Sequence, residues 1–217
     1  MKKNMTNWIA IFISLLPLIY LAIIWRSLPA IVPMHYGADM QPDRMGSKSE
    51  LWLVEGILVT ISIGVYFLFR NLHRFDPKRK DAVSSTAFTK IAFGMVVFIA
   101  ALSFLILSAV KTGAPNFSLL FPLVGLLFAF IGNYMNNIKP NYFAGFRLPW
   151  TLSSDENWRK THHLGSKIWF AGGMLITIVC LFLPFKIAFI FFFSVVAVMV
   201  LIPLVYSYRL FKNKEAR

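Results

Sequence analysis

The chain has 217 residues, of which 58% are hydrophobic and 14% are charged, and its formal net charge is +13. A soluble domain is usually about one half apolar and about one quarter charged, so this composition excludes an ordinary soluble protein and indicates an integral membrane protein. The positive charge does not predict nucleic-acid binding, because the basic residues lie at the ends of apolar runs, where membrane orientation and anionic lipids account for them.

Six apolar runs follow one another, each close to the roughly 20 residues that cross about 30 Å of hydrocarbon. They cover about residues 8–25, 51–69, 91–110, 117–135, 168–183 and 187–206. The first run is expected to be a retained helix, because Pro17 lies in its middle and no small-residue cleavage site follows it. The sequence therefore predicts an all-α, polytopic membrane protein with six transmembrane helices and one short interfacial helix.

Basic residues indicate the orientation of these helices. If both termini and the second and fourth loops are cytoplasmic, 17 of the 22 Lys and Arg residues lie on that side and five on the other. Because cytoplasmic loops carry an excess of Lys and Arg, both termini are predicted to be cytoplasmic. The chain then divides into residues 1–70, two helices joined by an outer loop, and residues 71–217, four helices with a structured cytoplasmic loop at 136–167.

Small residues recur at intervals of four in three of the runs. Such faces let helix backbones approach closely in a membrane, so we expect them to form the inner seams of the bundle. They are Gly56, Thr60 and Gly64 in the second run, Gly125, Ala129 and Asn133 in the fourth, and Gly173 and Thr177 in the fifth.

The outer loop, residues 26–50, is rich in Pro and Gly and is predicted to be compact. Its titratable side chains could form a hard metal site or an acid/base pair, although their spacing matches no zinc or calcium signature. Turn capping and pairing with nearby cations explain the same side chains. The residues concerned are His35, Asp39, Asp43, Glu50 and Glu55.

Glu55 lies about one turn inside the second run. An ionisable side chain within a transmembrane segment is a functional candidate. It is explained equally well by a carboxylate that reaches outward to a cation of the outer loop, so both interpretations stay open.

The inner loop contains a predicted helix. Ser153, followed three residues later by Glu156, matches a capping box, and Gly165 is placed to end a helix of about ten residues. Its polar and apolar positions predict that it lies on the membrane surface, with Trp158 in the membrane and its cations toward lipid phosphate. His162 and His163 are adjacent and cannot both face one metal ion from a helix.

The stretch before that helix, between Pro140 and Pro149, cannot cross the bilayer as a helix. Its backbone groups need water, lipid headgroups or protein partners. It is either a structured cytoplasmic platform, a plug beneath the bundle, or an interfacial connector with anchoring aromatic residues.

The run from Gly132 to Gly165 resembles the SdpI-type immunity proteins, which are multi-spanning proteins of the bacterial cytoplasmic membrane. The matching positions are Gly132, Asn133, 139–143, Gly145, Arg147, 149–154, 158–162 and Gly165. The outer loop resembles a short domain of unknown function that precedes this region in many members. It matches at Leu28, Pro29, Pro33, His35, Pro42, Asp43, Gly46 and Lys48, and the chain departs from the usual pattern at Gly37, Met40, Asn136 and Asn137.

The resemblance implies protection against a secreted antibacterial peptide and, as a companion role, sequestration of a cytoplasmic repressor at the membrane. From the residues themselves we expect no cofactor, no catalytic centre and no direct contact with nucleic acid. The candidate residues facing a toxin or other outer ligand are His35, Asp43, Lys48 and Glu55. The candidate platform residues are Asn133, Lys139, Pro140, Asn141, Tyr142, Gly145, Arg147, Pro149, Trp150, Trp158, Arg159, Lys160 and His162.

Two other functions remain open from the sequence. A small transporter or lipid-facing enzyme would use Glu55 and the acidic outer loop, but the other five runs hold no interior carboxylate, lysine or arginine. A signalling anchor would hold a regulator through Pro77, Lys78, Arg79 and Lys80 together with the inner helix.

Overall fold

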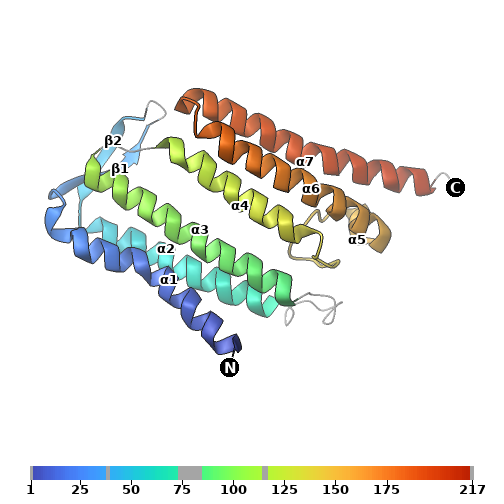
Figure 1. Cartoon of the computed structure of the whole chain (residues 1–217), viewed down its shortest axis with the longest axis horizontal. Helices are drawn as coiled ribbons and strands as arrows, with labels where there is room; N and C mark the ends of the chain where they lie inside the picture. The colour runs from blue at the N-terminus through green and yellow to red at the C-terminus, as the bar shows by residue number, and fades with distance from the viewer. Residues whose placement is uncertain (1, 38–39, 73–84, 114–116, 216–217) are drawn as a thin grey trace.

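The structure is a computed structural model that describes residues 2–37, 40–72, 85–113 and 117–215. The described chain is mainly helical, and its long helices run side by side in one bundle (Figure 1). The α-helices are α1 (Lys2–Ile24), α2 (Glu50–Asn71), α3 (Ser85–Thr112), α4 (Leu120–Met135), α5 (Pro149–Leu152), α6 (Asp155–Cys180) and α7 (Phe185–Glu215). Two 3-10 helices, η1 (Trp25–Ser27) and η3 (Phe117–Leu119), precede β1 and α4.

Five of the described helices are long and apolar enough to cross a membrane, namely α1, α2, α3, α6 and α7. The sixth predicted crossing corresponds to α4, an apolar helix of 16 residues. The prediction of an all-α polytopic membrane protein is therefore confirmed. Asp39 lies outside the described residues, and so do Pro77, Lys78, Arg79 and Lys80, which were proposed as part of a signalling anchor.

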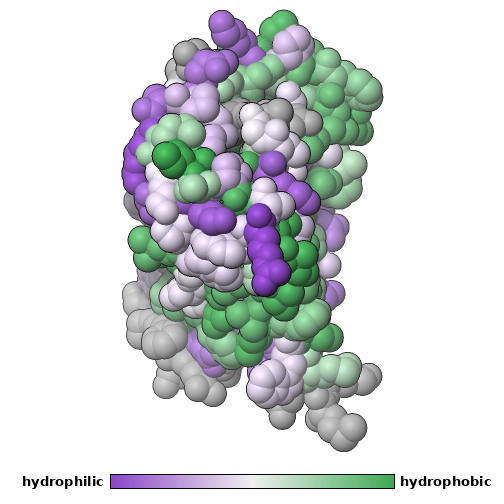
Figure 2. Space-filling model, turned by 90° about the vertical axis from the view of Figure 1, so that its left-hand side faces the viewer, coloured by the Kyte–Doolittle hydropathy of each residue, from purple (hydrophilic) through white to green (hydrophobic). Residues whose placement is uncertain are grey.

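The outer loop folds as an antiparallel β-hairpin of β1 (Ile31–Tyr36) and β2 (Pro42–Ser47), with Ile31 opposite Ser47. It lies at one end of the bundle, whereas α5 and the C-terminal end of α7 lie at the opposite end (Figure 1). Figure 2 looks onto the hairpin end and shows hydrophilic side chains over much of it, with hydrophobic side chains beside them. The two candidate sites therefore occupy opposite ends of the bundle.

The helix predicted over residues 153–165 forms, but it does not end at Gly165. It continues as α6 through the fifth apolar run, so the prediction of a separate surface helix is wrong. The N-cap is Ser154, whose Oγ accepts a hydrogen bond from the Asn157 amide, one residue later than the predicted capping box. Gly165 serves close packing instead, since a Cβ there would lie 2.6 Å from the Phe146 ring.

The predicted seam of small residues is confirmed between α4 and α6 for Gly125, Ala129, Gly173 and Thr177. Its third member on α4 is wrong, because Asn133 is exposed and the neighbouring Gly132 packs against α6 instead. A Cβ on Gly125 would lie 2.8 Å from the Gly173 carbonyl oxygen, and Thr177 Oγ1 donates a hydrogen bond across the seam to the Pro122 carbonyl. These contacts bring the two backbones together as expected for small residues in membrane helices.

The seam predicted on α2 is wrong. No atom lies within 4 Å of a Cβ built on Gly56 or Gly64, and Thr60 is exposed. The buried face of α2 is instead formed by Leu51, Glu55, Val59, Ser62 and Tyr66.

Candidate functional site

The outer candidate residues surround the β-hairpin but do not form one cluster. His35 on β1 and Asp43 on β2 form an ion pair or hydrogen bond with 2.6 Å between Nδ1 and Oδ1. Their side chains are 67% and 52% exposed, so this pair is available to a ligand outside the membrane. Among the described residues, no group of three or more His, Cys, Asp or Glu side chains could hold a metal ion.

Lys48 connects the end of the hairpin to η1 and the residue that follows it through hydrogen bonds. Its Nζ donates hydrogen bonds to the carbonyl oxygens of Trp25 (3.0 Å) and Leu28 (3.2 Å) and lies 4.7 Å from the centroid of the Trp25 ring. A cation at the C-terminal end of a helix interacts favourably with its unpaired carbonyls. This geometry supports a structural role for Lys48.

Glu50, at the start of α2, is the anionic partner within the hairpin. Its carboxylate accepts hydrogen bonds from the Arg44 guanidinium (2.7 Å) and from the Ser47 backbone amide (3.0 Å). The pairing of loop acids with loop cations that the sequence allowed is confirmed for this residue.

Glu55 is fully buried, with 0% of its surface exposed. Within the described part of the chain, neither carboxyl oxygen has a hydrogen-bond partner, and no ion pair forms there, so the interpretation that it reaches a loop cation is wrong. Farther along the same face of α2, Ser62 lies 2.8 Å from Ser14, oxygen to oxygen, and the Tyr66 hydroxyl donates to Asn7 Oδ1 at 3.0 Å. Glu55 thus begins a polar face inside the bundle and is not part of the exposed hairpin surface.

At the opposite end, Asn141 organises the loop between α4 and α5. Its Nδ2 donates to the carbonyls of Lys139 (2.8 Å) and Ala144 (3.2 Å), and its Oδ1 accepts from the amides of Phe143 and Ala144, both at 2.8 Å. The side chain uses both amide hydrogens and its carbonyl oxygen within one turn, and the residue is 2% exposed. The loop is therefore an ordered structure.

His162 on α6 supports the same loop. Its Nδ1 lies 2.9 Å from the Trp158 carbonyl, and its Nε2 lies 3.1 Å from the Phe146 backbone nitrogen. Because a carbonyl only accepts and an amide only donates, the imidazole is neutral with its proton on Nδ1. Gly145 has a φ of +107°, and a Cβ at this position would overlap His162 Nε2.

Trp158 is 1% exposed and lies in a hydrophobic cluster with Leu72, Phe88 and Ile91. Its Nε1 donates to the Ile138 carbonyl at 2.9 Å, and its ring stacks on His162 with 4.0 Å between centroids. The prediction that Trp158 anchors the helix in lipid is therefore wrong. The residue instead joins the loop to the ends of α2 and α3.

Contacts to α7 complete the platform. Asn157 Nδ2 donates to the Ser207 carbonyl at 2.9 Å, and Trp150 Nε1 donates to Ser207 Oγ at 3.0 Å. Thr151 Oγ1 donates to the Phe146 carbonyl at 2.6 Å and accepts from the Leu148 amide. Asn157, Thr151 and Ser207 were not among the predicted residues. The signal for Ser207 was its hydroxyl just beyond the end of the last apolar run.

The structure separates the other platform candidates from this buried framework. Arg147 donates to the Tyr142 carbonyl at 2.6 Å, and Lys160 pairs with Glu156 at 2.7 Å. Pro149 is the first residue of α5, a position where its missing amide hydrogen costs no helical hydrogen bond. Pro140 is half-buried, and the exposed candidates are Asn133, Lys139, Tyr142, Gly145, Arg147, Pro149 and Arg159.

Comparison with known proteins identifies two regions of the chain. Residues 137–207, which contain the platform, α6 and most of α7, match the SdpI/YfhL protein family. Residues 12–59, which contain most of α1, the hairpin and the start of α2, match a domain of unknown function, DUF1648. Both matches confirm the resemblance found in the sequence. No curated protein and no solved structure matches the chain.

Proposed function

We propose that this chain, with its SdpI/YfhL region at residues 137–207, is a membrane immunity protein that protects the cell against a secreted antibacterial peptide. The observation that carries the proposal is that this family region coincides with the hydrogen-bonded platform and the two helices that hold it. Protection requires binding of an apolar peptide and needs no catalytic residue.

The exposed side of the hairpin is the proposed contact for the peptide outside the membrane. His35 and Asp43 offer a paired imidazole and carboxylate on adjacent strands, and Met45 on β2 is 53% exposed beside them. A peptide with apolar and basic side chains would find both kinds of partner there. Lys48 and Glu50 hold the hairpin in place beneath this surface.

A second contact surface, within the bilayer, is supported by an apolar hollow of about 300 Å³ between α3 and α4. Phe93, Val97 and Ala101 of α3 face Leu126 and Phe130 of α4 around it. An apolar peptide segment that enters the membrane could be retained in this hollow.

The proposed orientation places both termini and the platform in the cytoplasm. The 17 to 5 distribution of basic residues supports it, and the separation of hairpin and platform to opposite ends of the bundle is consistent with it (Figure 1). The peptide contact and the platform then face different compartments.

A cytoplasmic repressor is the proposed partner of the platform's exposed face. Lys139, Arg147 and Arg159 are exposed there, while Asn141, Trp158 and His162 lie in its framework. The exposed cations could hold an acidic surface of a regulator, and the framework would keep them at fixed positions.

A small transporter remains the second candidate function, because Glu55 is a buried carboxyl inside the bundle and polar side chains continue along the same face of α2. Intramembrane ionisable residues often mark ion or proton pathways. In this case Glu55→Gln would abolish transport and would leave binding of a peptide at the hairpin unchanged.

The deciding experiment exposes a deletion strain to culture supernatants from peptide-secreting strains of the same species. Survival is compared after complementation with the wild-type gene and with the empty vector. We expect the wild-type gene to restore survival against at least one supernatant. Equal survival of both strains against every supernatant would contradict an immunity function.

A further inference from the structure

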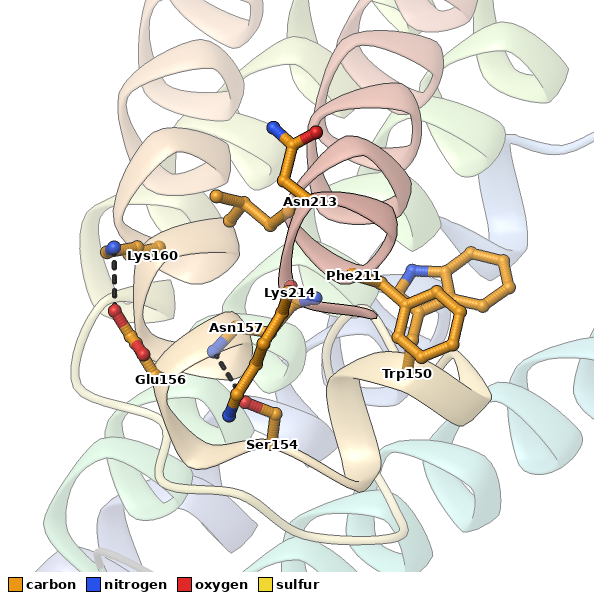
Figure 3. A pocket seen from close by; sticks show the side chains of 9 residues that line it. Trp150, Ser154, Glu156, Asn157, Lys160, Phe211, Asn213 and Lys214 are labelled. Carbon is orange, nitrogen blue, oxygen red and sulfur yellow. Dashed lines mark hydrogen bonds and ion pairs between the residues drawn. The ribbon is translucent and has the colours of Figure 1, made fainter. Parts of the chain in front are cut away.

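A cavity of about 440 Å³, lined by charged, amide and aromatic side chains, lies at the platform end of the bundle, between the start of α6 and the end of α7 (Figure 3). Lys160 and Glu156 of α6 lie on one side of the cavity, and the side chain of Lys214 of α7 extends across it (Figure 3). Trp150 of α5 lies beside Phe211 of α7 (Figure 3). The Trp150 ring stacks on Phe211 with 6.1 Å between centroids. Aromatic and basic side chains together are typical of the membrane interface.

A second hollow, of about 350 Å³, lies between the same two helices toward the middle of the bundle. Leu164 of α6 and Ile202, Val205 and Arg209 of α7 line it. Lys160 and Asn213 line the first cavity, whereas Leu164 and Arg209 line the second. Leu164 follows Lys160 by four residues, and Asn213 follows Arg209 by four. Residues four apart share a helix face, so the two hollows are successive parts of one groove.

The groove is apolar toward the middle of the bundle and basic toward the platform end. Ile202 and Val205 are 45% and 44% exposed on a helix long enough to cross the membrane, so hydrocarbon covers them. From Ile202 to Lys214 the α-helical rise gives about 18 Å, which is close to half of the roughly 30 Å hydrocarbon core. The apolar part therefore lies at acyl-chain depth and the basic part at headgroup depth.

The basic part carries an excess of positive charge. Lys160 is paired with Glu156 at 2.7 Å. Arg209 and Lys214 are both exposed, and neither forms an ion pair within the described ranges. Basic pockets between transmembrane helices bind the headgroups of anionic lipids.

We propose that this groove binds an anionic phospholipid. Its phosphate lies at Arg209 and Lys214, and one acyl chain follows Leu164, Ile202 and Val205. A soluble phosphate or an acidic peptide would use the basic end alone and would leave the apolar hollow to other lipids. The continuity of the two hollows therefore favours a lipid.

The test uses the full-length protein, purified in detergent, and native mass spectrometry to count phosphatidylglycerol retained per protein, with phosphatidylcholine as the neutral comparison. The variant Arg209→Gln/Lys214→Gln removes the two cations. Its matched control, Lys111→Gln/Lys186→Gln, removes two exposed cations at the other end of the bundle. Thermal unfolding checks that each variant is folded.

We expect the wild type and the control to retain phosphatidylglycerol in preference to phosphatidylcholine, and the Arg209→Gln/Lys214→Gln variant to bind it about tenfold more weakly. Equal retention by this variant and the control would overturn the proposal. Val205→Trp fills the apolar hollow while keeping every charge, and we expect it to weaken retention as well.

Glycerol 3-phosphate supplies the headgroup without acyl chains. If it displaced phosphatidylglycerol at equal concentration, or if Val205→Trp retained lipid normally, the apolar hollow would contribute nothing and a soluble phosphate compound would replace lipid as the ligand. If glycerol 3-phosphate does not displace phosphatidylglycerol, the result supports the lipid site. None of these measurements depends on peptide killing, so the outcome is independent of the proposed immunity function.

Discussion

Gly145 and His162 are in such close contact that any side chain on Gly145 would overlap the imidazole Nε2. The same nitrogen accepts the Phe146 amide hydrogen, so the residue after the glycine is hydrogen-bonded to the ring that the glycine touches. The loop is thus fixed to α6 at a point where both backbone conformation and close approach require glycine.

Gly145→Ala is expected to lower the free energy of unfolding by about 2 kcal/mol or more, because it adds both strain at positive φ and a steric overlap. Thermal or chemical unfolding in detergent measures the change. Gly113→Ala is the matched control, since Gly113 has a φ of +65° but no atom lies within 4 Å of its Cβ position. Equal losses in the two variants would show that the contact with His162 contributes nothing.

Trp158→Ala should cost about 3–5 kcal/mol, as expected for a large buried aromatic residue in a core. Trp158→Phe keeps an aromatic ring but loses the hydrogen bond to Ile138, and the backbone carbonyl left without this donor adds about 1–3 kcal/mol. Trp8→Ala is the control, because Trp8 is 70% exposed. If Trp158→Ala and Trp8→Ala have similar unfolding transitions, Trp158 does not hold the platform together.

Trp150 and Ser207 should show a coupling of about 0.5–1.5 kcal/mol in a double-mutant cycle, because their side chains share one hydrogen bond between α5 and α7. The cycle compares Trp150→Phe, Ser207→Ala and the double variant by unfolding in detergent. Additive effects would mean that this bond does not contribute to the docking of α5.

Cysteine accessibility in intact cells tests the orientation. In a Cys180→Ala background, cysteines at Met40 and Met45 in the hairpin should react with an impermeant reagent, and cysteines at Lys139 and Asp155 should be protected. Labelling of Asp155→Cys from outside would reverse the proposed topology.

Protection by the hairpin predicts that His35→Gln and Asp43→Asn reduce survival in the killing assay while protein levels in the membrane stay normal. Both changes remove a titratable group at nearly constant volume from the exposed pair. Arg44→Gln on the same hairpin is the control, since it breaks the pair with Glu50 but leaves His35 and Asp43 in place. If Arg44→Gln reduced survival to the same degree, the hairpin would act through its fold rather than through this pair.

Release of a regulator from the platform is a separate expectation. Arg159→Glu reverses an exposed charge and should move a membrane-bound repressor to the cytoplasm without reducing survival, as followed by fractionation. Simultaneous loss of both activities at normal protein level would indicate one coupled switch in place of two independent surfaces.

Hydropathy predicted the membrane class and the order of the helices because apolar runs of this length have few other uses. It did not predict that α6 continues through Gly165 into the fifth apolar run, because the first turns of α6 are polar and resemble a separate surface helix in the sequence. Trp158 was predicted to insert into the membrane because the sequence does not reveal the residues that bury it. Its burial depends on Leu72 and Phe88, which are distant in the sequence and come together with it only in the folded bundle.

The choice of helix face was predictable only in part. Gly125 and Gly173 were correctly expected in a seam, but Gly56 and Gly64 have the same spacing and face outward. Spacing shows which residues share a face, whereas the packing of α2 is decided by the opposite face, with Leu51 and Tyr66. The hydrogen bonds of His162 and Asn157 could not be predicted, because their partners lie 16 and 50 residues away.

The uninterrupted course of α6 has a mechanical consequence. A helix of 26 residues is about 39 Å long, and such a helix curves only gently, so α6 can be treated as one rigid element. It packs closely against α4 at Gly173, where the two backbones are in direct contact. If α6 tilted as a rigid body about this contact, a displacement at its junction with α7 would move Trp158 and His162 at the far end in the opposite direction.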